Sequence, residues 1–151
     1  MDKSPSLQQK IQQSASEELT RYYTGEKGVK LEHHTVGEMA DSFEIIEHPQ
    51  HYVIRGNSSR ALLYGVYRFL EKVEGLVFFD LQQPKKISPP GISQRYIGLP
   101  KFARRGNVFE TIDDVPFLKS MLDVGTKNGL NEVFFTFFLW DEVKDALLED
   151  I

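Results

Sequence analysis

A strand–helix–strand pattern in the last third of the chain limits its possible folds more than any other feature. Residues 102–109 fit a strand, and Asp113 and Asp114 can cap a helix in which Pro116 occupies the first turn. The run at 133–140 is then almost continuously apolar, which is typical of a strand buried on both faces of a parallel sheet. We therefore predict one βαβ unit, with a further helix from residue 141.

The first 80 residues follow a different pattern. Residues 6–24 carry an apolar side chain at every fourth position and begin with Ser6 and Gln9, which predicts an amphipathic helix with a capping box. A short strand is expected at 29–34. The runs at 43–47 and 52–55 flank a Pro49 turn and predict a hairpin. A second amphipathic helix follows the Asn57-Ser58-Ser59 turn and stops at Gly75. This half therefore predicts an α+β fold, a small antiparallel sheet packed by two helices.

The two halves are joined by a stretch rich in Pro, Gly, Lys and Ser, in which only 95–97 is strand-like. We predict an α+β domain over 1–81, a linker over 82–99 and a second domain over 100–151. One βαβ unit cannot close a (β/α)8 barrel, because eight are required. We therefore expect the sequence to stop inside an incomplete barrel.

Charge and composition exclude several classes of partner. The chain has 18 Lys plus Arg against 22 Asp plus Glu, a net charge of −4, which argues against binding nucleic acid or an anionic membrane. It has no cysteine, hence no disulfide and no thiol nucleophile. The N-terminus is polar and shows no signal peptide, so a cytoplasmic location without a membrane partner is expected.

The four histidines do not predict a metal site. His33 and His34 are adjacent, so on a strand their side chains point to opposite faces. His48 and His51 bracket the Pro49 turn, with no acid at ligand spacing except Glu47 nearby. We expect neither a metal nor another cofactor.

A resemblance to a known family is carried by three motifs in order. Residues 100–106, Pro-Lys-Phe-Ala-Arg-Arg-Gly, followed by Glu110 and Thr111, resemble the first barrel strand of family 20 glycoside hydrolases, the β-hexosaminidases. The similarity continues through 122–131, in the first barrel helix and the turn after it. Residues 52–70, with a Tyr-Gly pair, are similar to the small domain that precedes these barrels, to which a domain of the α-glucuronidases is related.

The resemblance implies a carbohydrate site in the intact parent protein. It implies that Arg105 hydrogen-bonds sugar hydroxyls, for which a guanidinium has suitably paired donors. Trp140 and Asp141 follow the second predicted strand, where a barrel places substrate-binding groups. The alternatives are an ion pair of Arg105 with Glu110 or with an acid of the next strand, a core position for Trp140 and a helix-dipole role for Asp141.

The family's catalytic Asp-Glu pair lies after the fourth barrel strand, which this sequence does not contain, so no catalytic residue is assigned. We expect the N-terminal fragment of a hexosaminidase- or glucuronidase-like glycoside hydrolase, inactive alone, whose parent binds a carbohydrate substrate. The unpaired edges of a cut barrel also predict a homo-oligomer through residues 100–151. The alternative is a stand-alone α+β module that binds carbohydrate or protein.

Overall fold

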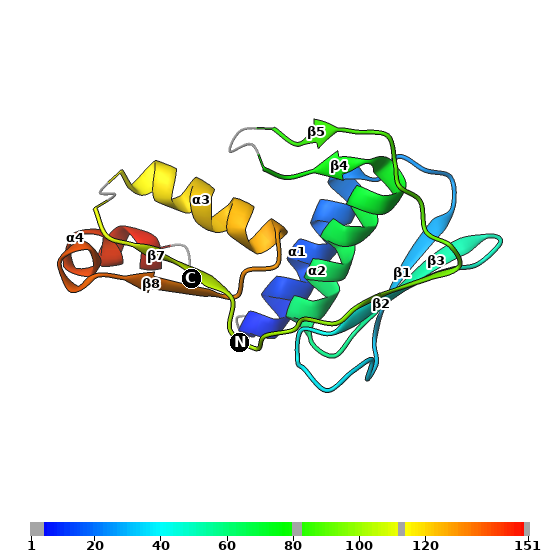
Figure 1. The fold of residues 1–151 in the computed structure, drawn as a ribbon, viewed down its shortest axis with the longest axis horizontal. Coiled ribbons are helices and arrows are strands. Elements are labelled where there is room, and N and C mark those ends of the chain that lie inside the picture. Colours follow the sequence, from blue (N-terminus) through cyan, green and yellow to red (C-terminus); the bar gives the residue numbers. More distant parts are fainter. Residues whose placement is uncertain (1–4, 80–82, 112–113, 150–151) are drawn as a thin grey trace. The chain divides into compact units, whose positions relative to one another are not determined.

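The structure is a computed structural model that describes residues 5–79, 83–111 and 114–149. It contains two compact units, each of which is described by itself (Figure 1). Unit 1 comprises Met1–Val77 and Lys86–Ala103, and unit 2 comprises Phe78–Lys85 and Arg104–Ile151. The α+β class predicted from the sequence is confirmed.

Unit 1 is a four-stranded sheet with two helices on one face. Its elements, in chain order, are α1 (Leu7–Tyr22), β1 (Gly28–His33), β2 (Phe43–Glu47), β3 (His51–Gly56), α2 (Ser59–Phe69), a π-helical turn η1 (Leu70–Glu74), β4 (Leu76–Val77) and β6 (Arg95–Gly98). The strand order in the sheet is β1-β3-β2-β6, and β4 pairs separately with β5 (Lys85–Lys86).

The sheet differs from the predicted antiparallel one in two respects. Strand β3 pairs antiparallel with β2, as the predicted hairpin requires, but parallel with β1, so the sheet is mixed. The long connection over residues 34–42 allows β1 to lie on the far side of β3 instead of beside β2. In addition, residues 95–98 form an edge strand against β2 and belong to the sheet rather than to a linker.

The helix ends of unit 1 follow the predicted capping residues. Ser6 Oγ accepts from the Gln9 backbone N–H at 3.3 Å and Gln9 Oε1 accepts from the Ser6 N–H at 2.7 Å, which completes the capping box. Ser58 caps α2 by accepting from Ala61 N–H. Gly75 ends the helical segment with φ at +70°, a left-handed conformation that glycine adopts without strain.

The core of unit 1 lies between α2 and the sheet. Ile45 and Ile54 of the sheet and Leu62, Val66 and Phe69 of α2 are fully buried. Helix α1 lies beside α2 on the same face of the sheet, and its one fully buried residue is Ala15 (Figure 1). Because only this narrow stripe of α1 is buried, α2 supplies most of the apolar contact that holds the unit together.

Unit 2 contains the predicted βαβ arrangement. Strand β7 (Gly106–Phe109) pairs parallel with β8 (Glu132–Phe135), and α3 (Val115–Lys127) connects them. Asp114 Oδ1 caps α3 by accepting from Phe117 N–H at 3.0 Å, and Pro116 lies in the first turn, as predicted. Asp113 lies outside the described residues. The described part of unit 2 shows this one parallel pair, and the described residues of the chain form no barrel.

The apolar run at 133–140 is only in part a strand. Strand β8 ends at Phe135, and α4 (Phe137–Leu148) begins after Thr136, whose N–H donates to Phe109 O at 3.1 Å. Leu139 and Val143, one helical turn apart, are buried against Phe109 and Leu118. The predicted eight-residue strand was therefore wrong, because its second half buries its side chains with helical spacing.

The burial of Phe69 predicts a large effect of its truncation. We expect Phe69→Ala to destabilise unit 1 by about 3–5 kcal/mol, because it opens a cavity beneath Tyr23 and Tyr52, whose rings contact Phe69 edge-on. Phe117→Ala is the control, since that side chain is 40% exposed in unit 2. Urea unfolding of both variants measures the difference, and equal losses would contradict the assignment of the core.

Candidate functional site

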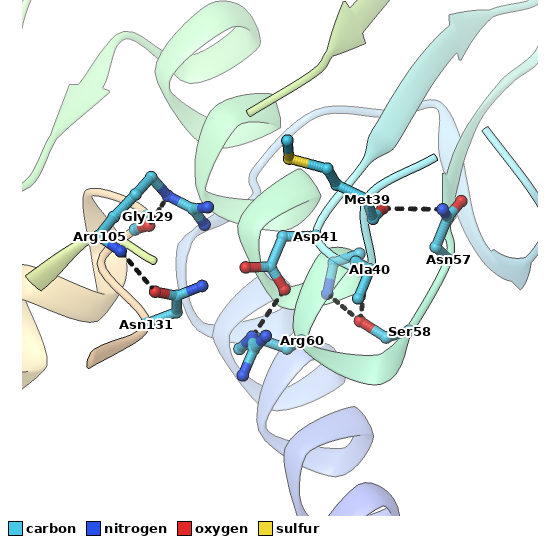
Figure 2. A network of polar contacts seen from close by, with 10 residues as sticks. Met39, Ala40, Asp41, Asn57, Ser58, Arg60, Arg105, Gly129 and Asn131 are labelled. Atoms are coloured by element: carbon cyan, nitrogen blue, oxygen red, sulfur yellow. Dashed lines mark hydrogen bonds and ion pairs between the residues drawn. The ribbon is translucent and has the colours of Figure 1, made fainter. Parts of the chain in front are cut away.

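Arg105 immediately precedes β7 and is bonded to the loop between α3 and β8 (Figure 2). Its Nε donates to Gly129 O and its backbone N–H donates to Asn131 Oδ1, both at 2.9 Å. Its carbonyl in turn accepts from the N–H groups of Asn131 and Glu132. These four bonds give Arg105 a structural role in fixing the register of β7 and β8, whatever else the guanidinium binds.

The adjacent Arg104 forms an ion pair with Glu132, the first residue of β8. Its Nε lies 2.8 Å from both carboxylate oxygens of Glu132, and its guanidinium lies over the Phe134 ring, 5.5 Å from the centroid. Hydrogen bonding to Arg104 lowers the pKa of Glu132 below its ordinary value, and the same bond raises the pKa of Arg104. The pair is exposed, so it orients side chains more than it stabilises the fold.

Trp140 and Asp141 lie in the first half of α4 instead of at a strand end. The Trp140 ring packs against Phe135 with 5.8 Å between centroids, and 38% of the residue remains exposed. Asp141 forms an ion pair of 3.0 Å with Lys144 in the next turn. The partial exposure leaves part of the indole accessible to a ligand, while its inner side belongs to the core of unit 2.

The three predicted binding residues therefore do not lie at one edge of the sheet. Because β7 and β8 are parallel, Arg105 is at their amino ends, whereas α4 with Trp140 and Asp141 starts beyond their carboxyl end. A four-residue strand spans roughly 13 Å. In α/β folds the carboxyl edge is the one at which substrates bind, which favours Trp140 and Asp141 over Arg105 as ligand contacts.

A second polar cluster braces the start of α2 in unit 1 (Figure 2). Asn57 Nδ2 donates to the carbonyls of Gly37 and Met39, and Asn57 Oδ1 accepts from the N–H of Val36. Ser58 Oγ donates to Ala40 O. The backbone and side-chain groups around this turn are thus used to hold the loop before β2. The sequence had suggested only a helix cap here.

Arg60 and Asp41 extend this cluster. The Asp41 carboxylate, 4% exposed, accepts from Arg60 Nε at 2.7 Å (Figure 2). A buried carboxylate is costly without such a partner, so the pair anchors the loop to α2. The spacing of Asp41 and Arg60 in the sequence gives no signal of this contact.

Unit 1 also contains a pocket that the sequence did not suggest. It offers about 570 Å³ at the end of β2 and is lined by Lys27, Ile46, Glu47, His48, Pro49, Gln94 and Arg95. Lys27 Nζ donates to Glu47 Oε1 at 2.7 Å, and Tyr52 OH donates to the same oxygen at 3.2 Å. Hydrogen bonding to Lys27 lowers the pKa of Glu47, and the same bond raises the pKa of Lys27.

Two features are absent from the described ranges. No three His, Asp or Glu side chains there converge in a way that could ligate a metal ion. No helix within them has the length and apolarity needed to cross a bilayer.

Solved structures of a glycoside hydrolase contain a part that is similar to this chain. A family 89 glycoside hydrolase from Clostridium perfringens in complex with PUGNAc matches with a TM-score of 0.59 and 16% identity, covering 82% of this chain and 16% of the enzyme chain. Its complex with 2-acetamido-1,2-dideoxynojirmycin gives 0.58 and 16%, and a variant bound to its substrate GlcNAc-alpha-1,4-galactose gives 0.58 and 17%. No family model and no curated protein matches the sequence.

The likeness defines a class of fold. The chain resembles a small part of a family 89 glycoside hydrolase and spans about one sixth of that enzyme's length. Unit 1 makes up less than two thirds of the chain. An alignment that covers 82% of the chain therefore also includes part of unit 2. A glycoside hydrolase was expected from the sequence, but the motifs had suggested the family 20 β-hexosaminidases or the α-glucuronidases, whereas the matched structures belong to family 89.

The Arg104–Glu132 pair predicts a specific pH response. Because the pKa of Glu132 is lowered in the folded chain, the pair contributes stability above the ordinary glutamate pKa. This contribution is lost as the pH falls through the lowered value. NMR titration of the Glu132 carboxyl should give a pKa that moves back up in Arg104→Gln and stays low in Arg104→Lys. An unchanged titration in Arg104→Gln would show that Arg104 is not the cause.

Proposed function

We propose that this chain is the N-terminal part of a glycoside hydrolase that acts on glycosides of N-acetylglucosamine. Unit 1 serves as a non-catalytic α+β domain, and unit 2 supplies the first βαβ unit of the catalytic barrel. The observation that carries the proposal is the shared fold over both units. The N-acetyl preference follows the ligands of the matched enzyme, one a 2-acetamido sugar analogue and one a GlcNAc disaccharide.

In this proposal unit 2 contributes to sugar binding but not to bond cleavage. Most glycosidases cleave the bond with a pair of carboxyl groups, and the resemblance to family 20 implies that the catalytic Asp-Glu pair follows a later barrel strand. Trp140, which is 38% exposed, offers part of its indole for stacking on a sugar, and Asp141 offers a carboxylate for a sugar hydroxyl. Arg105 holds the α3–β8 loop at the opposite, amino end of the two strands.

The test is hydrolysis of aryl N-acetylglucosaminides, in both anomeric forms, by the complete product of the gene. We expect turnover by the complete product and none above background by the 151-residue chain alone. Turnover by the 151-residue chain, abolished by a substitution within it, would overturn the proposal, as would an inactive complete product.

Variants of the complete product test the role of Trp140. Trp140→Ala should raise KM several-fold with little change in kcat, because stacking is made to substrate and transition state alike. Leu148→Ala, also an exposed apolar position of α4, is the control and should leave KM unchanged. An unaltered KM in Trp140→Ala would show that the indole has a role in the core only and does not bind substrate.

The uncovered face of β7 and β8 favours a second role as an interaction module. Val108 and Phe134 are paired neighbours and are 62% and 46% exposed. The helices cover the other face, where Phe109 and Phe135 pack. We infer that the isolated chain associates with a second copy through residues 100–151, because open strand edges beside apolar side chains pair readily.

This association is tested by light scattering at ~10–100 µM, where exposed strand edges commonly associate. The chain should form a dimer or larger species, and Val108→Lys should shift it to monomer by placing a charge in the contact. Leu7→Lys changes an equally exposed leucine of α1 and should leave the size unchanged. A monomeric wild-type chain would end this proposal.

A further inference from the structure

The two edge strands of the sheet in unit 1 differ in how well they could pair with a further strand. Strand β6 is four residues long, and Pro100 follows shortly after its end. Strand β1 is six residues long, contains no proline and, among the described residues of unit 1, pairs only with β3. An edge of this kind is a template for another strand. The outer edge of β1 is therefore the better of the two for strand addition.

The direction of the backbone decides which residues of β1 can bond to an added strand. His34 N–H donates to Gly56 O, at the end of β3, at 3.0 Å. Because the backbone groups of successive strand residues point to opposite sides, even-numbered residues of β1 direct theirs toward β3. The N–H and C=O groups of the odd-numbered residues therefore point away from the sheet. These residues are Val29, Leu31 and His33.

The side chains of β1 carry opposite charges on one face of the strand. Glu32 forms an ion pair with Arg55 of β3 at 3.0 Å. Lys30 lies two residues earlier, so it is on the same face, and it is exposed. Leu31 lies between them on the other face and is paired in register with Ile54, a residue of the buried core. The two charges are thus equally distant from Leu31 along the strand.

This charge pattern distinguishes between the registers in which β1 could pair with an antiparallel copy of itself. Odd-numbered residues bond to each other when the pair is centred on Lys30, Leu31 or Glu32. Centring on Lys30 or Glu32 places that charge opposite its own copy, and like charges directly opposite are destabilising. Centring on Leu31 places Lys30 opposite Glu32 of the second copy, and twofold symmetry repeats the pair. The strand is therefore self-complementary in one register.

We propose that unit 1 pairs with a second copy of itself through the outer edge of β1, antiparallel and centred on Leu31. The two Leu31 residues exchange both backbone hydrogen bonds, and Val29 of each copy does so with His33 of the other. The contact is confined to one pair of short strands, so the pairing is weak. It involves unit 1 alone, and it depends neither on the proposed glycosidase activity nor on the association through residues 100–151.

A disulfide trap tests the pairing and its register together. The chain has no cysteine of its own. Directly opposite residues at a non-hydrogen-bonded position have Cα atoms about 4.5 Å apart, which a disulfide can span. Lys30→Cys and Glu32→Cys chains are mixed in equal amounts and oxidised, each also carrying Val108→Lys to remove the other proposed contact. Mass spectrometry should show the disulfide between the two different variants well above its share from random pairing.

The control replaces one partner of this mixture. Glu38→Cys changes an exposed glutamate in the loop after β1, and its mixture with Lys30→Cys should give random pairing. Random pairing of Lys30→Cys with Glu32→Cys would overturn the proposal. An excess of disulfides between two copies of the same variant would also overturn it, because it would show a register centred on Lys30 or Glu32.

Amide NMR of the Val108→Lys chain at increasing concentration is a second test that needs no cysteine. Up to ~1 mM, the scale of a weak Kd, the signals of residues 29, 31 and 33 should shift more than those of 30 and 32. Lys30→Glu should abolish these shifts, because like charges then face each other twice. Lys86→Glu, the same change at another exposed lysine, should leave them unchanged. Signals that do not depend on concentration would contradict the proposal.

Discussion

The close approach of α2 to the sheet is the constraint on which unit 1 depends. A Cβ atom at Gly65 would lie 2.5 Å from Ile54 Cγ2, closer than any real side chain allows. A glycine within a helix costs about 0.5–1 kcal/mol relative to alanine. Here that cost is offset because the helix can bury most of its circumference, from Ala61 through Phe69. Helix α2 can therefore approach β3 this closely because residue 65 has no side chain.

A buried carboxylate then determines which strands can flank β2. Glu44 is 2% exposed and is held by Arg95 of β6 through Nε at 2.6 Å and by Arg55 of β3 at 3.6 Å. Arg55 also binds Glu32 of β1 at 3.0 Å, so charges alternate across all four strands. Without these arginines Glu44 would be a buried charge with no partner, which is far more costly than losing a surface ion pair. Strand β6 is therefore needed electrostatically, although it is only four residues long.

Local signals in the sequence predicted local structure well. Ser6, Ser58, Asp114 and Gly75 cap helices as expected, and the Pro49 turn joins a hairpin, because each of these signals acts within four or five residues.

What could not be predicted depends on partners distant in the chain. Residues 95–97 were recognised as strand-like, but their place in the sheet was not, because β6 pairs with a strand about fifty residues earlier. The helical start of α4 was hidden within an apolar run whose composition fits a strand equally well. The pocket at the end of β2 is lined by three separate segments of the chain, so no spacing in the sequence reveals it. Arg105 was predicted to bind substrate, and this stays a prediction; its place at the amino end of β7 depends on where the strand begins, which the sequence did not reveal.

Unit 2 leaves one physical question that links the two proposed roles of the chain. Parallel strands are normally covered on both faces, yet α3 and α4 pack on one face, and Val108 and Phe134 remain on the other. Arg104 covers Phe134 only through a cation–π contact. Further barrel strands would enclose these two side chains in a barrel interior, and a second copy would cover them in an interface. The same surface cannot do both at once, so a protein in which further strands cover this face would not associate through it.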